Sequence, residues 1–190
     1  DLVSMTSEEI VALSKKHTIF EWTAQKNVAP IAVAHAEGVY FWTPEDKRFI
    51  DFNSQLMSVN IGHGDRRVIE AIREQAELVT YVAPSFSTEP RARLGAKLAD
   101  ITPGDIDVFF FTNGGAEANE TAFKIARAYT GRSKIISFYR SYHGGTAGAM
   151  AATGEPRGWL QPPLPRFLHV LNPHHGITRG TDTSDYGVRH

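Results

Sequence analysis

Cysteine is absent from the 190 residues of the chain, which excludes disulfides, iron–sulfur ligation and thiol catalysis. No apolar run is long enough to span a bilayer, and the N-terminal segment DLVSMTSEE is not a signal peptide. Neither sign of charge dominates, because 20 Lys and Arg residues against 21 Asp and Glu residues give a net charge of −1. This balance gives no sign of a nucleic-acid or membrane partner, and we expect a soluble cytoplasmic protein.

The composition that remains is that of an ordinary globular protein, with 42% hydrophobic and 22% charged residues. The length suits one domain, or one domain with an added piece. Thr6 and Glu9 form a capping-box pattern that predicts a short helix. Three extended stretches follow and are separated by turn formers: AVAHAEG, VYFW and RFIDFN. Their aromatic and β-branched residues predict a small antiparallel meander.

The pattern changes near residues 60–65. After Asp65, apolar residues at helical spacing predict a helix, and Glu89-Pro90 predicts the first turn of another. We therefore expect residues 1–62 to form a small N-terminal segment, a helix plus the meander. Residues 63–190 are expected to begin a larger domain.

A strand, a glycine turn and a helix follow one another in DVFFFTNGGAEANETAFKIARAYTG, residues 107–131. The apolar run 108–111 predicts a strand covered on both faces. The next residues predict a helix with one apolar stripe, a Glu120–Lys124 pair and a C-cap at Gly131. KIISF predicts a second strand and GGTAGAMAATG a further helix. A strand–helix–strand order indicates parallel strands and an α/β fold.

The glycine turn has the properties of a phosphate site. Gly114 and Gly115 let the backbone approach a ligand closely, and a helix N-terminus offers free N–H groups with a positive partial charge. From the spacing alone, a plain tight turn without a ligand is equally acceptable. The turn matches neither the P-loop pattern nor G-x-G-x-x-G.

Three motifs in order are more specific than the turn alone: FNSQLMSVNIGHG, TNGGAEANETAFKIAR and SYHGGTAGA. Together they resemble the N-terminal portion of class III (omega-type) pyridoxal-phosphate-dependent aminotransferases. The resemblance implies the α/β, aspartate-aminotransferase-like fold of fold type I enzymes. In that fold a small N-terminal α+β part precedes a large domain with a mainly parallel sheet, which this chain would contain incompletely. It also implies pyridoxal 5'-phosphate as cofactor and a homodimer.

The resemblance assigns cofactor-binding roles to five residues. Gly114, Gly115 and Ala116 match the turn that binds the cofactor phosphate through backbone N–H groups. The family commonly has hydroxyl residues on either side of the central glycine, and this chain lacks them there. Tyr142 matches the aromatic residue that stacks on the pyridine ring, and His143 is next to it. By itself, without the family pattern, Tyr142 is better interpreted as an ordinary aromatic residue at a strand end than as a stacking residue.

Leu56 and Met57 match positions that line the substrate pocket in the family, although the default for such residues is the core. Methionine at this place indicates a roomy, adaptable pocket. We expect His63 to serve a turn rather than to act as a base. His174 and His175 lack Cys or carboxylates at ligand spacing nearby, so no metal site is expected.

No catalytic residue is assigned within this chain. The family places its Schiff-base lysine, its ring-nitrogen carboxylate and its substrate arginine well after the YHG motif. We therefore expect the N-terminal part of a longer enzyme, or a truncated copy. The reaction implied is amino-group transfer from an amine or omega-amino acid to a keto acid such as pyruvate. An aminomutase or decarboxylase, a degenerate non-catalytic chain and a nucleotide-binding α/β protein stay open as alternatives.

Overall fold

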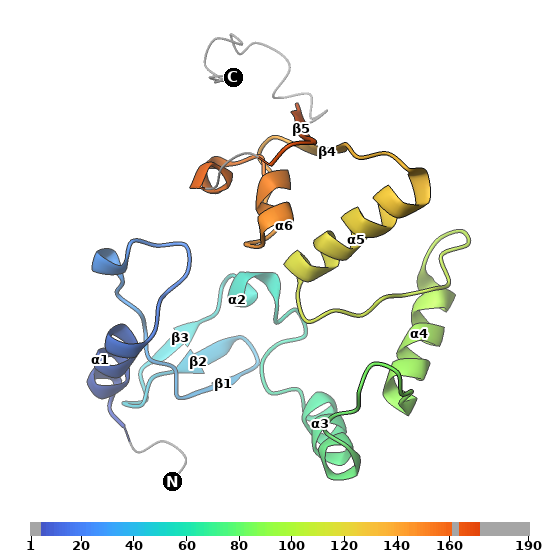
Figure 1. Ribbon diagram of the computed structural model, residues 1–190. Helices are drawn as coiled ribbons and strands as arrows, with labels where there is room; N and C mark the ends of the chain where they lie inside the picture. The colour runs from blue at the N-terminus through green and yellow to red at the C-terminus, as the bar shows by residue number, and fades with distance from the viewer. Residues whose placement is uncertain (1–4, 161–163, 172–190) are drawn as a thin grey trace. The chain divides into compact units, whose positions relative to one another are not determined.

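The computed structural model describes residues 5–160 and 164–171 of the chain. They belong to two compact units, Asp1–Ser87 and Thr88–His190, and each unit is described by itself (Figure 1). The assignment of residues 1–62 and 63–190 to a small and a large domain stays a prediction. No helix in the described ranges has the length and apolarity needed to cross a membrane.

The first unit contains the predicted helix and meander. Helix α1, Ser7–His17, begins at Thr6, and both hydrogen bonds of the capping box with Glu9 are present. Strands β1 (His35–Glu37), β2 (Tyr40–Trp42) and β3 (Arg48–Ile50) pair antiparallel in the order β1-β2-β3. Phe41 and Phe49 are direct cross-strand partners, and their rings stack with centroids 5.2 Å apart. Such pairs stabilise small sheets, and the predicted meander is confirmed.

The first unit also contains a short 3₁₀ helix, Gln25–Asn27, and two further helical segments. Segment α2, Ser54–Met57, is a left-handed turn in which all residues have φ between 48° and 63°. Helix α3, Arg66–Leu78, is right-handed and begins at Asp65, whose side chain accepts from the N–H of Arg67. The helix predicted after Asp65 is therefore confirmed.

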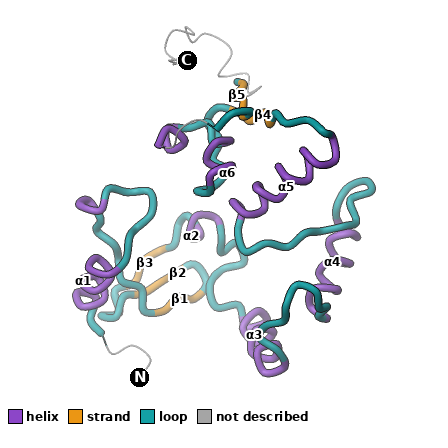
Figure 2. Tube along the Cα trace, viewed as in Figure 1, coloured by secondary structure: helices purple, strands orange, loops and turns teal. Residues whose placement is uncertain are grey.

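The second unit contains helices α4 (Glu89–Ile101), α5 (Gly115–Thr130) and α6 (Ala147–Ala152), and the 3₁₀ helix η2, Pro156–Leu160. Strands β4 (Ile135–Phe138) and β5 (Phe167–Val170) pair in parallel, and α6 lies between them in sequence (Figure 2). Helix α5 ends at Gly131, which adopts the left-handed conformation (φ 67°) expected of a C-cap. Its side chains contact β5, because Phe123 meets Phe167 edge to face with centroids 5.4 Å apart. The predicted strand at KIISF and the helices predicted in the segments that contain α4, α5 and α6 are confirmed.

The strand predicted at residues 108–111 is wrong. These residues form no strand, and Val108 and Phe110 are 86% and 68% exposed. A strand exists through hydrogen bonds to a neighbouring strand. Among the described residues β4 pairs with β5 and no strand lies against 108–111. The parallel partner of KIISF is therefore the later run FLHV.

Few large apolar side chains are covered. In the part of the chain that the structure describes, the buried hydrophobic residues are Val28, Ala32, Ala149 and Ala152. Leu94 in α4 is 47% exposed, and Ile125 and Tyr129 on the apolar stripe predicted for α5 are 57% and 91% exposed. The most completely buried hydrophobic positions are those of α6, where Ala149 and Ala152 are almost inaccessible.

The bridge between Tyr139, just after β4, and Gly154, two residues after α6, generates a stability prediction. A Cβ atom on Gly154 would lie 2.7 Å from the Cα of Tyr139, closer than real Cβ atoms approach backbone. We expect Gly154→Ala to lower the free energy of unfolding by about 1–3 kcal/mol, the cost of overpacking. The control is Gly95→Ala in α4, where the added Cβ meets nothing within 4 Å. It should raise stability by about 0.5–1 kcal/mol. Urea unfolding of both variants tests this, and equal shifts would contradict the packing argument.

Candidate functional site

The glycine turn forms an open helix N-terminus. Gly114 is the N-cap of α5, with extended φ and ψ of −168° and 166°, and no side chain caps the helix there. By contrast, Thr6 and Asp65 cap α1 and α3 with their side chains. Cβ atoms built on Gly114 and Gly115 would meet nothing within 4 Å. The first turn of this 16-residue helix therefore has N–H groups that no capping side chain covers, with open space beside the two glycines. Such a helix start suits an anion.

The polar side chains next to the turn have partners other than the first N–H groups of the helix. Glu117 accepts from the backbone N–H of Asn113 at 2.9 Å and from its side-chain amide at 3.3 Å. The hydroxyl of Thr112 donates to the carbonyl oxygen of Gly114 at 3.1 Å. These bonds fix the residues that enter the helix. Glu117 therefore stabilises the start of the helix, where a carboxylate also interacts favourably with the helix dipole.

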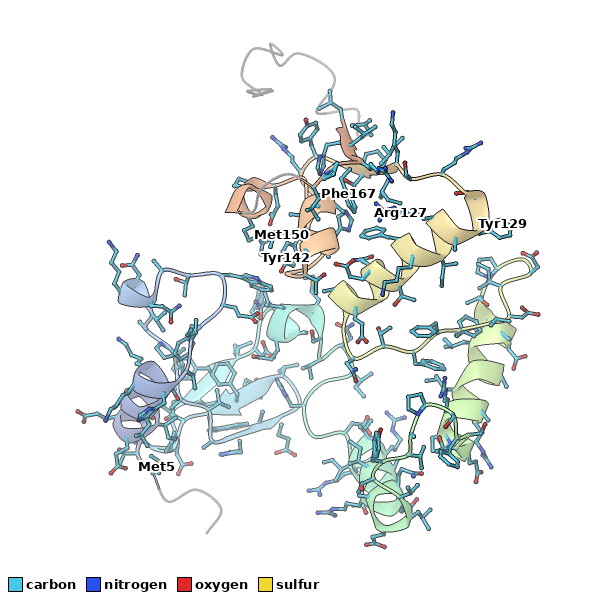
Figure 3. The ribbon with its side chains drawn as sticks, viewed as in Figure 1. Met5, Arg127, Tyr129, Tyr142, Met150 and Phe167 are labelled. Atoms are coloured by element: carbon cyan, nitrogen blue, oxygen red, sulfur yellow. The ribbon has the colours of Figure 1, made fainter. Side chains whose placement is uncertain are left out.

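Tyr142 lies in the loop between β4 and α6. Its side chain is partly exposed, at 37% for the residue, and the guanidinium carbon of Arg157 lies 4.2 Å from its ring centroid. Figure 3 labels Tyr142 near α6. Arg157 also pairs with Glu155, whose carboxylate raises the pKa of Arg157. A cation therefore sits on the face of an aromatic ring, an arrangement that is attractive because the ring face is negative.

His143 anchors the same loop through its backbone. Its N–H donates to the hydroxyl of Thr153 at 3.1 Å, and its carbonyl oxygen accepts from the Asn119 side chain at 2.7 Å. Gly144 follows with φ 132° and packs so closely on α5 that an added Cβ would lie 2.8 Å from the Cα of Ala116. The structure thus brings the glycine turn and the YHG loop into contact. The roles of the five predicted cofactor residues stay predictions.

Two residues at this junction had no predicted site role, Asn119 and Glu120. Glu120 was expected to pair with Lys124, and Lys124 does contribute to lowering its pKa. The direct partners of Glu120 are instead at the start of α6. Its Oε1 accepts from Oγ1 of the N-cap residue Thr146 at 2.7 Å, and from the N–H groups of Gly148 and Ala149 at 2.7 and 3.2 Å. In the sequence, these bonds could have been indicated by the two small residues at 148 and 149, because small side chains let a carboxylate reach the backbone N–H groups.

Leu56 and Met57 belong to the first unit. They lie on the left-handed turn α2 and are 55% and 74% exposed. Asp51 accepts from the N–H of Gln55 at 3.1 Å and from His63 Nε2 at 2.7 Å. His63 therefore braces this turn through a carboxylate, and its backbone pairs with Gly38. The pocket role of Leu56 and Met57 stays a prediction.

The described ranges contain no cluster of His, Asp and Glu able to hold a metal ion. His174 and His175 lie outside the described residues.

The fold and the site define an α/β chain that presents an open helix N-terminus beside an aromatic loop. The family described as aminotransferase class-III matches residues 22–184. The chain belongs to this class-III aminotransferase family. It is 41% identical over 184 residues to the uncharacterized aminotransferase YhxA of Bacillus subtilis (strain 168), covering 91% of this chain and 40% of that protein.

Solved structures agree in fold. An (S)-enantioselective omega-transaminase from Thermomicrobium roseum superposes with a TM-score of 0.85 and 38% identity, over 97% of this chain and 44% of that one. A taurine:2-oxoglutarate aminotransferase from Bifidobacterium kashiwanohense, solved with PLP and glutamate, superposes with a TM-score of 0.84 and 37% identity. The match covers 96% of this chain and 42% of that one. The chain therefore has the fold of type I PLP-dependent transaminases and spans about two fifths of the length of these relatives.

The bonds to Glu120 generate a pH prediction. The Thr146 hydroxyl, and to a lesser extent the α6 amides, hold the pKa of Glu120 below its ordinary value of 4.5, although burial opposes them. A depressed pKa stabilises the fold above the unfolded value, and this stabilisation is lost as pH falls through the folded value. We expect Glu120→Gln to have a smaller loss of unfolding free energy below pH 4.5 than the unchanged protein. Urea unfolding at several pH values measures this difference. If the unfolding free energies of the variant and the unchanged protein fall in parallel with pH, the prediction is contradicted.

Proposed function

We propose that residues 1–190 hold the cofactor of a pyridoxal-phosphate-dependent transaminase. The enzyme would move an amino group from an amine or omega-amino acid to a keto acid such as pyruvate. The observation that carries the proposal is the uncapped start of α5 at Gly114–Ala116, in contact with the Tyr142 loop, in a chain of the class-III aminotransferase family. The proposal includes a homodimer in the cytoplasm, as the sequence and its resemblance lead us to expect.

The phosphate end of the cofactor fits the glycine turn. A phosphate carries a charge near −2 at neutral pH, and the α5 N-terminus offers N–H groups and a positive dipole end. Open space beside Gly114 and Gly115 leaves room for a tetrahedral group. Gly114 and Ala116 have no hydroxyls, so binding depends on the backbone. Each missing hydrogen bond costs about 0.5–1.5 kcal/mol, which weakens binding without abolishing it.

The ring end fits the loop. Tyr142 presents an aromatic face suited to stacking on a flat pyridine ring. Arg157 on the tyrosine ring and the bonds of His143 restrict how the loop can move. Tyr142 would thus set the plane of the cofactor ring.

When bound, pyridoxal phosphate supplies the electron sink for the reaction. The residues of this chain bind and orient it. We assign the reacting lysine to a part of the enzyme outside residues 1–190, because none of the lysines here matches the family's catalytic context. Leu56 and Met57 would line the substrate pocket, where flexible unbranched side chains accommodate varied substrates.

The proposal is tested by the intact mass of the full-length gene product after borohydride reduction with pyridoxal phosphate. Reduction converts a lysine-bound cofactor into a stable adduct. We expect one adduct per polypeptide, on a mass above 21.0 kDa. A mass of 21.0 kDa with no specific adduct would overturn the proposal in favour of a non-catalytic chain.

The phosphate site is tested at Gly114. Gly114→Asp introduces a good N-cap, which should leave stability unchanged or higher. Its charge would repel the phosphate, so we expect the Kd for pyridoxal phosphate to rise at least about tenfold. Gly114→Asn has the same shape without the charge and should weaken binding less. Fluorescence titration and urea unfolding of both variants provide the comparison. Equal losses of affinity would contradict an anion at this turn.

A further inference from the structure

One face of α5 contacts the segment that directly follows Tyr142. Ala116, Asn119 and Glu120 are spaced i, i+3 and i+4, so they share a face of the helix. Ala116 is packed against Gly144, and Asn119 donates to the carbonyl oxygen of His143 at 2.7 Å. The three side chains therefore meet successive parts of one segment, from His143 to Ala149.

Glu120 caps α6 from a different helix. The N-cap residue of α6, Thr146, makes no side-chain capping bond. Its hydroxyl donates instead to Glu120 Oε1, which also accepts the N–H groups of Gly148 and Ala149. A Cβ on Gly148 would lie 2.9 Å from the Glu120 carboxyl carbon, so only glycine lets the carboxylate approach. Charged acceptors at such positions form the stronger class of hydrogen bonds.

Asn119 and Glu120 are one helical turn from the residues assigned to the phosphate. A helix is rigid over that length, so the position of the YHG loop is fixed relative to the N–H groups at Gly114–Ala116. Pyridoxal phosphate needs a constant distance between the loop and the turn, because its phosphate and its ring are two ends of one small molecule. Both ends bind well only if their two sites keep a constant spacing.

We infer that Asn119 and Glu120 are positioning residues, which hold the Tyr142 loop on α5 so that the phosphate turn and the ring-stacking tyrosine keep the spacing of one cofactor molecule. This inference rests on the proposed function. It assigns both residues an effect on ring binding that is separate from phosphate binding.

The test compares Glu120→Ala and Asn119→Leu in the full-length gene product. The second variant has a side chain of similar size, adds no charge and cannot donate to the His143 carbonyl, so it keeps the test valid if Glu120→Ala folds poorly. Glu89→Gln is the control, since Glu89 forms an exposed pair with Arg93 on α4. Calorimetric titrations measure binding of pyridoxal phosphate and of inorganic phosphate. Hydrogen exchange without either ligand follows residues 142–149.

We expect both variants to raise the Kd for pyridoxal phosphate about tenfold, the effect of losing a charged or well-aligned hydrogen bond. Exchange in 142–149 should accelerate, and the Kd for inorganic phosphate should stay within about twofold, because the turn itself is untouched. The control should match the unchanged protein in all three measurements.

Equal losses of affinity for both ligands would reduce Asn119 and Glu120 to general structural residues and overturn the inference. Unchanged exchange and unchanged affinity for pyridoxal phosphate would overturn it as well. An unchanged protein that binds no pyridoxal phosphate would instead remove the proposed function, and this inference with it.

Discussion

The carboxylate of Glu120 is the interaction on which the described part of the second unit depends most. It replaces a missing N-cap on α6 and joins that helix to α5 by three hydrogen bonds. The α6 positions it secures include Ala149, which is fully buried, and the loop before α6 carries Tyr142. One ionised side chain therefore sets the relation between two helices and a loop. Isolated surface ion pairs contribute little, but a carboxylate with several donors and little freedom contributes more.

Recognition at the turn is expected to depend on backbone rather than side chains. The helix start at Gly114 has no capping side chain, and Cβ atoms added at Gly114 and Gly115 would meet nothing within 4 Å. The neighbouring polar groups of Asn113 and Thr112 are engaged elsewhere. Backbone N–H groups keep their position whatever the side chains are. A site of this kind tolerates the loss of hydroxyls better than the loss of its glycines.

Local signals predicted most elements, and distant contacts caused the errors. Thr6, Asp65 and Gly131 mark helix ends through bonds within a few residues, and each was readable from the sequence. The run 108–111 has the composition of a strand, but strand formation is decided by a partner elsewhere in the chain. Glu120 illustrates the same limit, since its donors lie 26 to 29 residues away. Spacing within the helix indicated only the neighbouring Lys124.

The left-handed turn at Ser54–Met57 limits how this part of the chain can vary. Each L residue held there costs roughly 1–2 kcal/mol relative to the right-handed form, and branching at Cβ makes the conformation worse. Asp51 offsets part of that cost by binding the N–H of Gln55. Evolution and protein engineering can therefore exchange Leu56 and Met57 more readily for residues that are unbranched at Cβ, whereas valine, isoleucine and threonine are disfavoured by the backbone before any ligand is considered.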